Sequence, residues 1–181
     1  MRCVGIAVFV TGLLLSNLTI AREYKFESNF DPASMQWSKQ IGNASVEGMG
    51  IYRTASGEMK TCAGQTILYY PYASYTVEYL RAQIQGYNQF DNLDRRIKDY
   101  RFAVQCNSDG QFVIHHLPAG KWIFVMSIPI VNNEDGKSSY NLASDMSQVA
   151  GEGYGTLYRV ITVSSAQKAQ VSLVQNDEFA H

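Results

Sequence analysis

Apolar and polar residues alternate along several short stretches of this chain, a pattern typical of half-buried β-strands. The clearest stretch is SDGQFVIHHLPAGKW at residues 108–122. Asp109-Gly110 predicts a turn, and Phe112 and Ile114 then alternate with more polar positions. The Pro-Ala-Gly triplet that follows predicts a second tight turn, closed by a positive φ at Gly120. This stretch therefore predicts one complete strand held between two turns.

Similar patterns and turn signals predict seven strands in all. Residues 121–129 read KWIFVMSIP, a nearly continuous apolar run, so this strand is predicted to be central and buried on both faces. The seven predicted strands are 44–54, 65–70, 101–105, 111–116, 121–129, 156–163 and 169–174. Seven short strands separated by turn signals predict a mainly β fold, in which two sheets pack as a β-sandwich.

One stretch, residues 74–99, has the period of a helix. Apolar residues fall on one helix face at the spacing i, i+3 and i+7 (Val77, Leu80 and Ile84). Ser74 is the predicted N-cap, and a second helical segment is predicted over 91–99. We expect a helical insertion between two strands, with its apolar face lying on a sheet.

The remaining segments flank or interrupt this domain, which we place at residues 44–174. Residues 22–43 are polar with scattered aromatic side chains and are expected to pack onto the domain as a lead-in. Residues 131–155 form a long polar stretch, and a loop of that length is either functional or mobile. Residues 175–181 are expected to be a frayed tail.

The first 21 residues have the features of a signal peptide. Arg2 is followed by an apolar run over 4–15, and Thr19-Ile20-Ala21 places small residues at a cleavage site. The alternative is an uncleaved anchor, but the run is shorter than the roughly 20 residues that span a bilayer. We expect an exported protein of the periplasm, cell surface or extracellular space. No integral membrane segment is expected after cleavage.

Charge and cysteine content limit the kinds of binding partner and the cellular compartment that we expect. The chain has 15 Lys and Arg against 16 Asp and Glu, a net charge of −1, which argues against nucleic acid as a partner. Cys3 lies in the predicted signal, which leaves Cys62 and Cys106 as an even pair in an oxidising compartment, where a disulfide is expected. The alternative is two free thiols that bind a metal or act in redox chemistry. Neither cysteine has a CxxC partner or a nearby histidine.

The turn motif resembles a known family. Asp109-Gly110-x-Phe112 followed by Leu117-Pro118-Ala119-Gly120-x-Trp122 is similar to the carboxypeptidase regulatory-like domain, as is the upstream segment VEGMGIYRTASGEMKTCAGQTILYYP. Tyr75 and Glu78 after it fit bacterial exported members that carry a helical insertion. The resemblance covers roughly residues 44–174. It implies a seven-stranded Greek-key sandwich of the transthyretin or prealbumin type.

The resemblance also implies an accessory module without catalytic activity. In metallocarboxypeptidases the catalytic zinc belongs to a different domain. A second relative of the fold, 5-hydroxyisourate hydrolase, is an enzyme and ends in a Tyr-Arg-Gly-Ser tail, whereas this chain ends in DEFAH. We therefore expect no enzyme activity, no catalytic residues and no cofactor.

A search for catalytic chemistry finds only one histidine pair. His115 and His116 are adjacent, and on a regular strand they would point to opposite faces, so they would not chelate one ion together. A glycine-rich stretch at residues 151–155 lacks the Gly-Lys-Ser/Thr of a phosphate loop. No metal site is predicted.

Five tyrosines form the candidate ligand surface, in the insertion and around the long loop: Tyr72, Tyr75, Tyr79, Tyr140 and Tyr154. The ordinary alternative is that the tyrosines near the insertion pack between it and the sheet. The expected partner is a protein, a glycan or another envelope component, bound by the loop 131–155 and the insertion. Two alternatives remain: a small metal-dependent or hydrolytic enzyme, and a structural subunit that offers a sheet edge to an envelope assembly.

Overall fold

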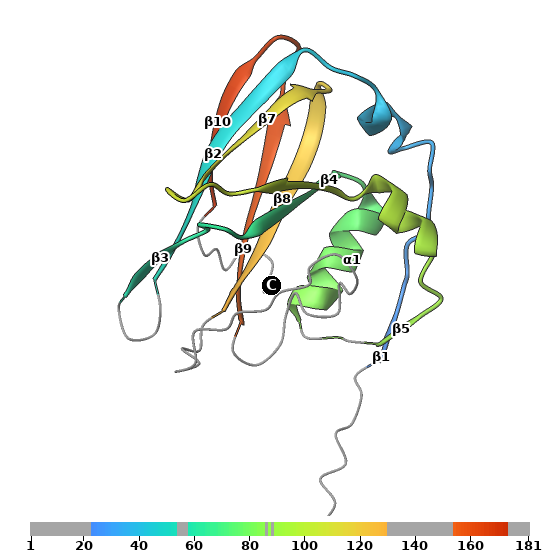
Figure 1. Ribbon diagram of the computed structural model, residues 1–181. Coiled ribbons are helices and arrows are strands. Elements are labelled where there is room, and N and C mark those ends of the chain that lie inside the picture. The colour runs from blue at the N-terminus through green and yellow to red at the C-terminus, as the bar shows by residue number, and fades with distance from the viewer. Residues whose placement is uncertain (1–22, 54–57, 86, 88, 130–153, 174–181) are drawn as a thin grey trace, which may run out of the picture.

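The protein is mainly β. Its structure, a computed structural model, describes residues 23–53, 58–85, 87, 89–129 and 154–173 (Figure 1). The predicted signal peptide, residues 131–153 of the predicted loop, and the tail lie outside the described residues. Within the described part of the chain, no helix is both long enough and apolar enough to span a membrane.

All seven predicted strands are present. They are β2 (Ala44–Arg53), β4 (Thr66–Pro71), β6 (Phe102–Gln105), β7 (Gln111–Leu117), β8 (Gly120–Pro129), β9 (Tyr154–Val163) and β10 (Lys168–Leu173). Three further strands bring the number in the described residues to ten: β1 (Glu23–Lys25), β3 (Met59–Thr61) and β5 (Gln89–Asp91). The predicted count of seven was therefore too low, because a strand of three residues is too short to show alternation.

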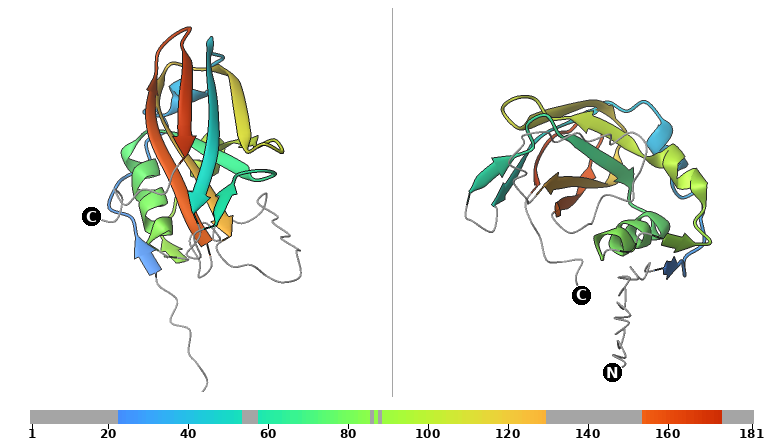
Figure 2. Two further views of the ribbon diagram at one scale, coloured as in Figure 1. Left: turned by 90° about the vertical axis from the view of Figure 1, so that its left-hand side faces the viewer. Right: turned by 60° about the horizontal axis from the view of Figure 1, so that its bottom comes forward.

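Eight of the strands form two four-stranded sheets. In the first, called the β2 sheet, β2 pairs with β10 in parallel on one side and with β7 and β3 in antiparallel on the other. In the second, called the β8 sheet, the antiparallel order is β6-β4-β8-β9. β1 and β5 form a separate two-stranded parallel sheet beside the helix (Figure 2).

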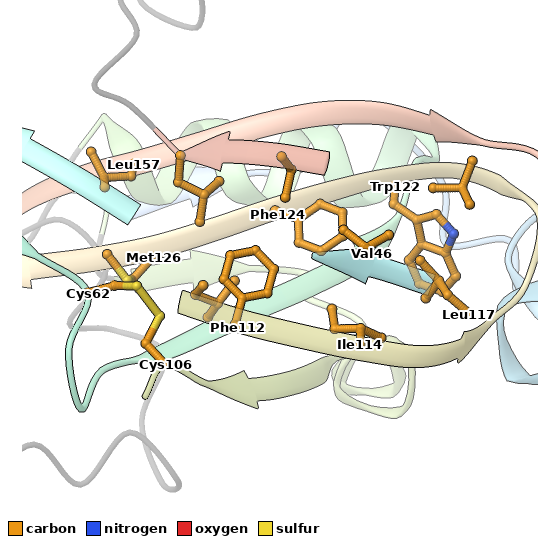
Figure 3. Packing of buried hydrophobic residues seen from close by; sticks show 14 of the residues in the cluster. Val46, Cys62, Cys106, Phe112, Ile114, Leu117, Trp122, Phe124, Met126 and Leu157 are labelled. Carbon is orange, nitrogen blue, oxygen red and sulfur yellow. A yellow bond between two sulfur atoms is a disulfide. The ribbon is translucent and has the colours of Figure 1, made fainter. Parts of the chain in front are cut away.

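Apolar side chains from both sheets meet in one core. Trp122, Phe124 and Met126 of β8 point toward Val46 and Phe112 of the β2 sheet (Figure 3). All five side chains are buried. Two sheets packed face to face across such a core form a sandwich.

The other face of the β8 sheet is buried as well. Ile123 and Val125 point into a second core, which helix α1 (Ser74–Ile84) and the lead-in cover. Figure 1 shows α1 and β1 on one side of the molecule and β10, β2 and β3 on the other. Trp122, Ile123 and Phe124 are each 0% exposed, so the prediction that this strand is buried on both faces is confirmed.

The insertion is helical only in part. Helix α1 begins at Ser74 and its N-cap is Ala73, so the prediction of Ser74 as the cap was wrong. The hydroxyl of Thr76 accepts the Ala73 N–H at 2.9 Å and donates to the Pro71 carbonyl at 2.8 Å, which fulfils the capping role from inside the helix. The predicted second helical segment is the 3-10 helix η2 (Arg95–Tyr100), preceded by β5.

The histidine pair does not follow regular strand alternation. His116 has a φ of 58°, and the register of β7 against β2 shifts at this point. Because of this bulge, both His115 and His116 are exposed, and Leu117 points inward again. The expectation that the two rings point to opposite faces was therefore wrong, and their centroids lie 6.5 Å apart.

Both predicted turns are present, and each depends on a glycine. Gly110 has a φ of +74° and Gly120 a φ of +154°, conformations that side chains with a Cβ rarely adopt. A Cβ on Gly120 would also lie 2.2 Å from an indole carbon of Trp37, in the 3-10 helix η1 (Gln36–Lys39) of the lead-in. The second turn therefore also makes room for the lead-in.

The structure contains the predicted disulfide. Cys62 follows β3, Cys106 follows β6, and their Cα atoms are 5.8 Å apart. Both residues are buried, at 0% and 3% exposed. The bond lies at one end of the inter-sheet core (Figure 3) and joins segments 44 residues apart in the sequence.

Candidate functional site

An open groove lies between the lead-in and helix α1. Its volume is about 460 Å³, within the roughly 300–1,000 Å³ usual for small-molecule sites. The lead-in contributes one wall, α1 the other, and the residue after β4 one end. The lining residues are Tyr24, Glu27, Ser28, Tyr72, Ser74, Val77, Glu78 and Arg81. The groove therefore combines aromatic rings with acidic, basic and hydroxyl groups.

Glu78 on α1 holds the lead-in wall in place. One carboxylate oxygen accepts the Tyr24 hydroxyl at 3.0 Å and the Glu27 N–H at 2.7 Å. The other accepts the Ser28 N–H at 2.8 Å and the Ser28 hydroxyl. One side chain thus accepts hydrogen bonds from three residues of the lead-in that lie 50 to 54 positions away in the chain.

A second side chain also fixes this segment of the lead-in. Asn92, which follows β5, accepts the Phe26 N–H at 3.0 Å and donates to the Phe26 carbonyl at 3.3 Å. The side-chain amide thereby mimics a strand partner just beyond the β1–β5 ladder. The ring of Phe26 is buried and stacks on Tyr75 of α1, with centroids 4.8 Å apart.

The hydrogen bonds also set the protonation of Glu78. Partial burial of this carboxyl by itself raises its pKa, but the hydrogen bonds from Ser28, Glu27 and Tyr24 outweigh that effect and hold the pKa below its usual value near 4.5. Glu78 is therefore an anion at neutral pH. At neutral pH its negative charge is therefore part of the groove.

We predict that Glu78→Gln loosens the lead-in. Glutamine keeps one acceptor oxygen but places an N–H donor opposite donors of the lead-in, which should cost about 1–2 kcal/mol of unfolding free energy. Because folding lowers the pKa of Glu78, its stabilisation is complete above the unfolded value and disappears as the pH falls through the folded one. Hydrogen exchange of residues 24–28, measured from neutral to acidic pH, checks both effects.

The matched control for this prediction is Glu47→Gln, which changes an exposed carboxylate on the β2 sheet. Protection of residues 24–28, which is the intrinsic exchange rate relative to their observed rate at the same pH, should fall as the pH is lowered in the wild type and should already be low in Glu78→Gln. Equal exchange in the wild type and in Glu78→Gln at neutral pH would contradict the role assigned to Glu78.

Tyr72 is the exposed aromatic residue of the groove. Its side chain is 39% exposed, and the ammonium of Lys121 lies 3.7 Å from the ring centroid. The Tyr72 N–H donates to the Lys121 carbonyl at 2.8 Å, so this pair extends the pairing of β4 with β8. A ring held by a cation and by its backbone is a fixed surface for stacking.

Tyr24 supplies the second ring. It packs edge-on against Tyr87 and Phe26, with centroids 5.0 and 5.4 Å away. Burial raises the pKa of its hydroxyl, and the hydrogen bond to the Glu78 carboxylate adds to this shift. The hydroxyl is thus a neutral donor whose direction is fixed.

Of the three predicted ligand tyrosines whose side chains the structure describes, one, Tyr72, lines this groove. Tyr75 and Tyr79 are 3% and 4% exposed and belong to the core beneath α1, the packing role that was the ordinary alternative. Tyr140 lies outside the described residues. Tyr154 begins β9 opposite Pro129, and its side chain is not described. The sequence singled out Glu78 only as part of the family resemblance, and it gave no signal that Tyr24 lines a site.

A second hollow lies on the β2 sheet. It has a volume of about 250 Å³, and its lining includes Glu47, Gln111 and Gln170. Its one aromatic liner, Phe112, is only 3% exposed, so it offers no ring face to a ligand. Across the described residues, no three His, Cys, Asp or Glu side chains are grouped closely enough to hold a metal ion.

The fold and the groove define a sandwich domain with one helix-covered sheet. No protein family and no curated protein matches the sequence. Among solved structures, a candidate carbohydrate binding protein from Pseudomonas aeruginosa is similar, with a TM-score of 0.57 and 18% sequence identity over 81% of this chain and 98% of that one. At this identity the likeness shows the fold.

Two other solved structures match more weakly. They are a DUF3823 family protein from Parabacteroides merdae, with a TM-score of 0.33, and a minor pilin from Streptococcus agalactiae, with a TM-score of 0.32. Each has 11% identity over 73% of this chain, which corresponds to 46% and 44% of their respective lengths. These values are too low to carry an argument about function.

Proposed function

We propose that this chain is an exported, non-catalytic module of the carboxypeptidase regulatory-like kind that binds a glycan. The ligand lies in the groove between the lead-in and α1, against Tyr72 and Tyr24. The predicted signal peptide directs the chain to the envelope or beyond it. There, recognition of a glycan attaches the module, or a partner that carries it, to a surface.

The observation that carries this proposal is the chemistry of the groove. Sugar rings have an apolar C–H face and a rim of hydroxyls, so their sites combine aromatic rings with hydrogen-bonding side chains. Tyr72 is exposed and held in place, and Glu27, Ser74 and Arg81 are exposed at the same groove. The likeness of the fold to a candidate carbohydrate binding protein adds support at the level of architecture.

A structural role in an envelope assembly is the second candidate function. β6 and β9 are the outer strands of the β8 sheet, and an outer strand can pair with a strand from another chain. Measurement of the molecular mass in solution over a range of concentrations separates the two functions, because an assembly subunit should form oligomers without any glycan.

We predict that Tyr72→Ala weakens glycan binding by about twofold to tenfold. Stacking on one aromatic ring contributes about 0.5–1.5 kcal/mol, and 1.4 kcal/mol corresponds to a factor of ten in affinity. The measurement is calorimetric titration of oligosaccharides selected by binding of the whole chain to an immobilised glycan panel. Tyr72→Phe keeps the ring and should retain most of the affinity.

Gln170→Ala, on the hollow of the β2 sheet, is the control and should bind as the wild type does. Thermal unfolding of each variant checks its fold, and Tyr72 is exposed enough for its removal to be tolerated. If no glycan on the panel bound the wild type, the proposed function would be wrong.

A further inference from the structure

The groove carries both signs of charge in equal number. Glu27 and Glu78 line it together with Arg81, and the ammonium of Lys121 lies over the ring of Tyr72 at its end. An anionic ligand would be repelled by the two carboxylates and attracted by the two basic side chains, and for a cationic ligand the two effects are reversed. Like charges brought together at a binding site oppose association, so neither kind of ion is favoured overall.

Glu78 has no capacity left for a ligand. A carboxylate offers about four lone-pair sites, and Glu78 already accepts four hydrogen bonds from Tyr24, Glu27 and Ser28. It therefore acts as a structural anion that holds the wall of the groove. An incoming hydroxyl group has to find its acceptor elsewhere.

Glu27 and Ser74 supply that acceptor capacity. Both side chains are exposed, and they belong to opposite walls, Glu27 to the lead-in and Ser74 to the first turn of α1. A carboxylate accepts hydrogen bonds only, and a hydroxyl both donates and accepts. This combination suits a ligand that presents several hydroxyl groups.

The ring of Tyr72 also favours an uncharged ligand. Tyr72 is already paired with one cation at 3.7 Å, so a ligand cation would compete with Lys121 for the ring. An uncharged C–H surface meets no such competition. The ring therefore favours contact with an apolar ligand face.

We infer that the groove selects an uncharged, hydroxyl-rich saccharide over acidic or basic ones, with one sugar ring on Tyr72 and a ligand hydroxyl donating to Glu27. This inference rests on the proposed function and narrows it to one chemical class. It also gives Glu27 a specificity role that its place in the sequence does not reveal.

The first test compares neutral and acidic oligosaccharides of equal length. Cellohexaose, maltohexaose and hexa-N-acetylchitohexaose are the neutral probes, and hexagalacturonate and hexamannuronate are the acidic ones. At least one neutral probe should bind the whole chain at least tenfold more tightly than either acidic probe. Its dissociation constant should change less than about twofold between about 0.05 M and about 0.5 M salt, because there is no net attraction to screen.

The second test is the direction of the effect of Glu27→Gln. For a neutral probe, the substitution replaces an ionised acceptor by a weaker neutral one, so binding should weaken about threefold to tenfold. For an acidic probe, the same substitution removes a repulsive charge, so binding should strengthen. Gln170→Ala serves again as the control outside the groove.

The outcomes separate this inference from the proposed function. Preferential binding of acidic probes, with an affinity that is lost at high salt, would overturn the inference and leave glycan binding in place. Binding of a neutral probe that is unaffected by both Tyr72→Ala and Glu27→Gln would place the site elsewhere and also overturn it. Absence of binding to either set of probes would remove the proposed function itself.

Discussion

Trp122→Ala is expected to lower the unfolding free energy by about 3–5 kcal/mol, the usual effect of truncating a large buried aromatic residue. Trp122 is 0% exposed and belongs to the inter-sheet core, at the end opposite the disulfide (Figure 3). Its ring meets Trp37 at 5.0 Å, Tyr69 at 5.6 Å and Phe102 at 5.7 Å. The substitution leaves a cavity that three rigid rings cannot fill.

The loss of unfolding free energy in Trp122→Ala also has a contribution from a hydrogen bond. The indole N–H donates to the Pro118 carbonyl at 3.0 Å, within the turn that joins β7 to β8. Alanine leaves that buried carbonyl without its partner, which adds to the cost of the cavity. The turn and the lead-in should therefore loosen together, because Trp37 packs on both Trp122 and Gly120.

Chemical denaturation monitored by circular dichroism measures the effect of Trp122→Ala. Val113→Ala is the control, because Val113 lies in the neighbouring sheet with 44% of its surface exposed and should change the stability by less than about 0.5 kcal/mol. A loss below about 1 kcal/mol for Trp122→Ala would contradict the core that the structure shows.

Removal of the disulfide, as Cys62→Ala with Cys106→Ala, is expected to cost about 4 kcal/mol. The bond closes a loop over a sequence separation of 44, and the chain-entropy model gives a value of this size for such a loop. The bond also fixes the approach of β4 to β6, where the Cys106 N–H donates to the Gln65 carbonyl at 2.9 Å. The melting temperature should fall by about 8–16 °C.

Reduction of the wild-type protein supplies the control for the disulfide. A reducing agent should lower the melting temperature of the wild type toward that of the double variant and leave the double variant unchanged. Thiol labelling of denatured, unreduced protein should find neither Cys62 nor Cys106 free. Labelling of both residues in protein recovered from an oxidising compartment would contradict the pairing.

Much of the fold could be predicted because its strands are long enough to show their period. Phe112 and Ile114 alternate with exposed positions in the sequence and point into the core in the structure. The turn glycines Gly110 and Gly120 could be predicted for a similar reason, since short-range sequence determines a tight turn. The disulfide could be predicted because two cysteines remain after the predicted signal peptide and an oxidising compartment is expected.

The features that escaped prediction depend on contacts between distant segments. β1 and β5 have three residues each and form only because they pair with each other. The positive φ of His116 belongs to a bulge opposite β2, and no local sequence pattern predicts that bulge. Both bring together segments far apart in the sequence.

The candidate site escaped prediction for the same reason. Glu78 holds the lead-in across about 50 residues of sequence, so its role appears only when the chain is folded. Of the tyrosines predicted to bind a ligand, Tyr75 and Tyr79 form the floor beneath α1, and Tyr72 remains at the surface. Tyrosine thus occurs both as a packing residue in the core and as a surface residue, and only its burial in the folded structure distinguishes the two roles.

The central claim is that a glycan binds between the lead-in and α1. The most direct measurement is a map of backbone amide chemical shifts of the whole chain, titrated with the tightest-binding oligosaccharide. We predict that the shifts change in residues 23–28 and 72–81, the two walls of the groove, and that in Tyr72→Ala the same changes need a higher ligand concentration. Changes confined to the β2 sheet, around Glu47 and Gln170, would contradict it.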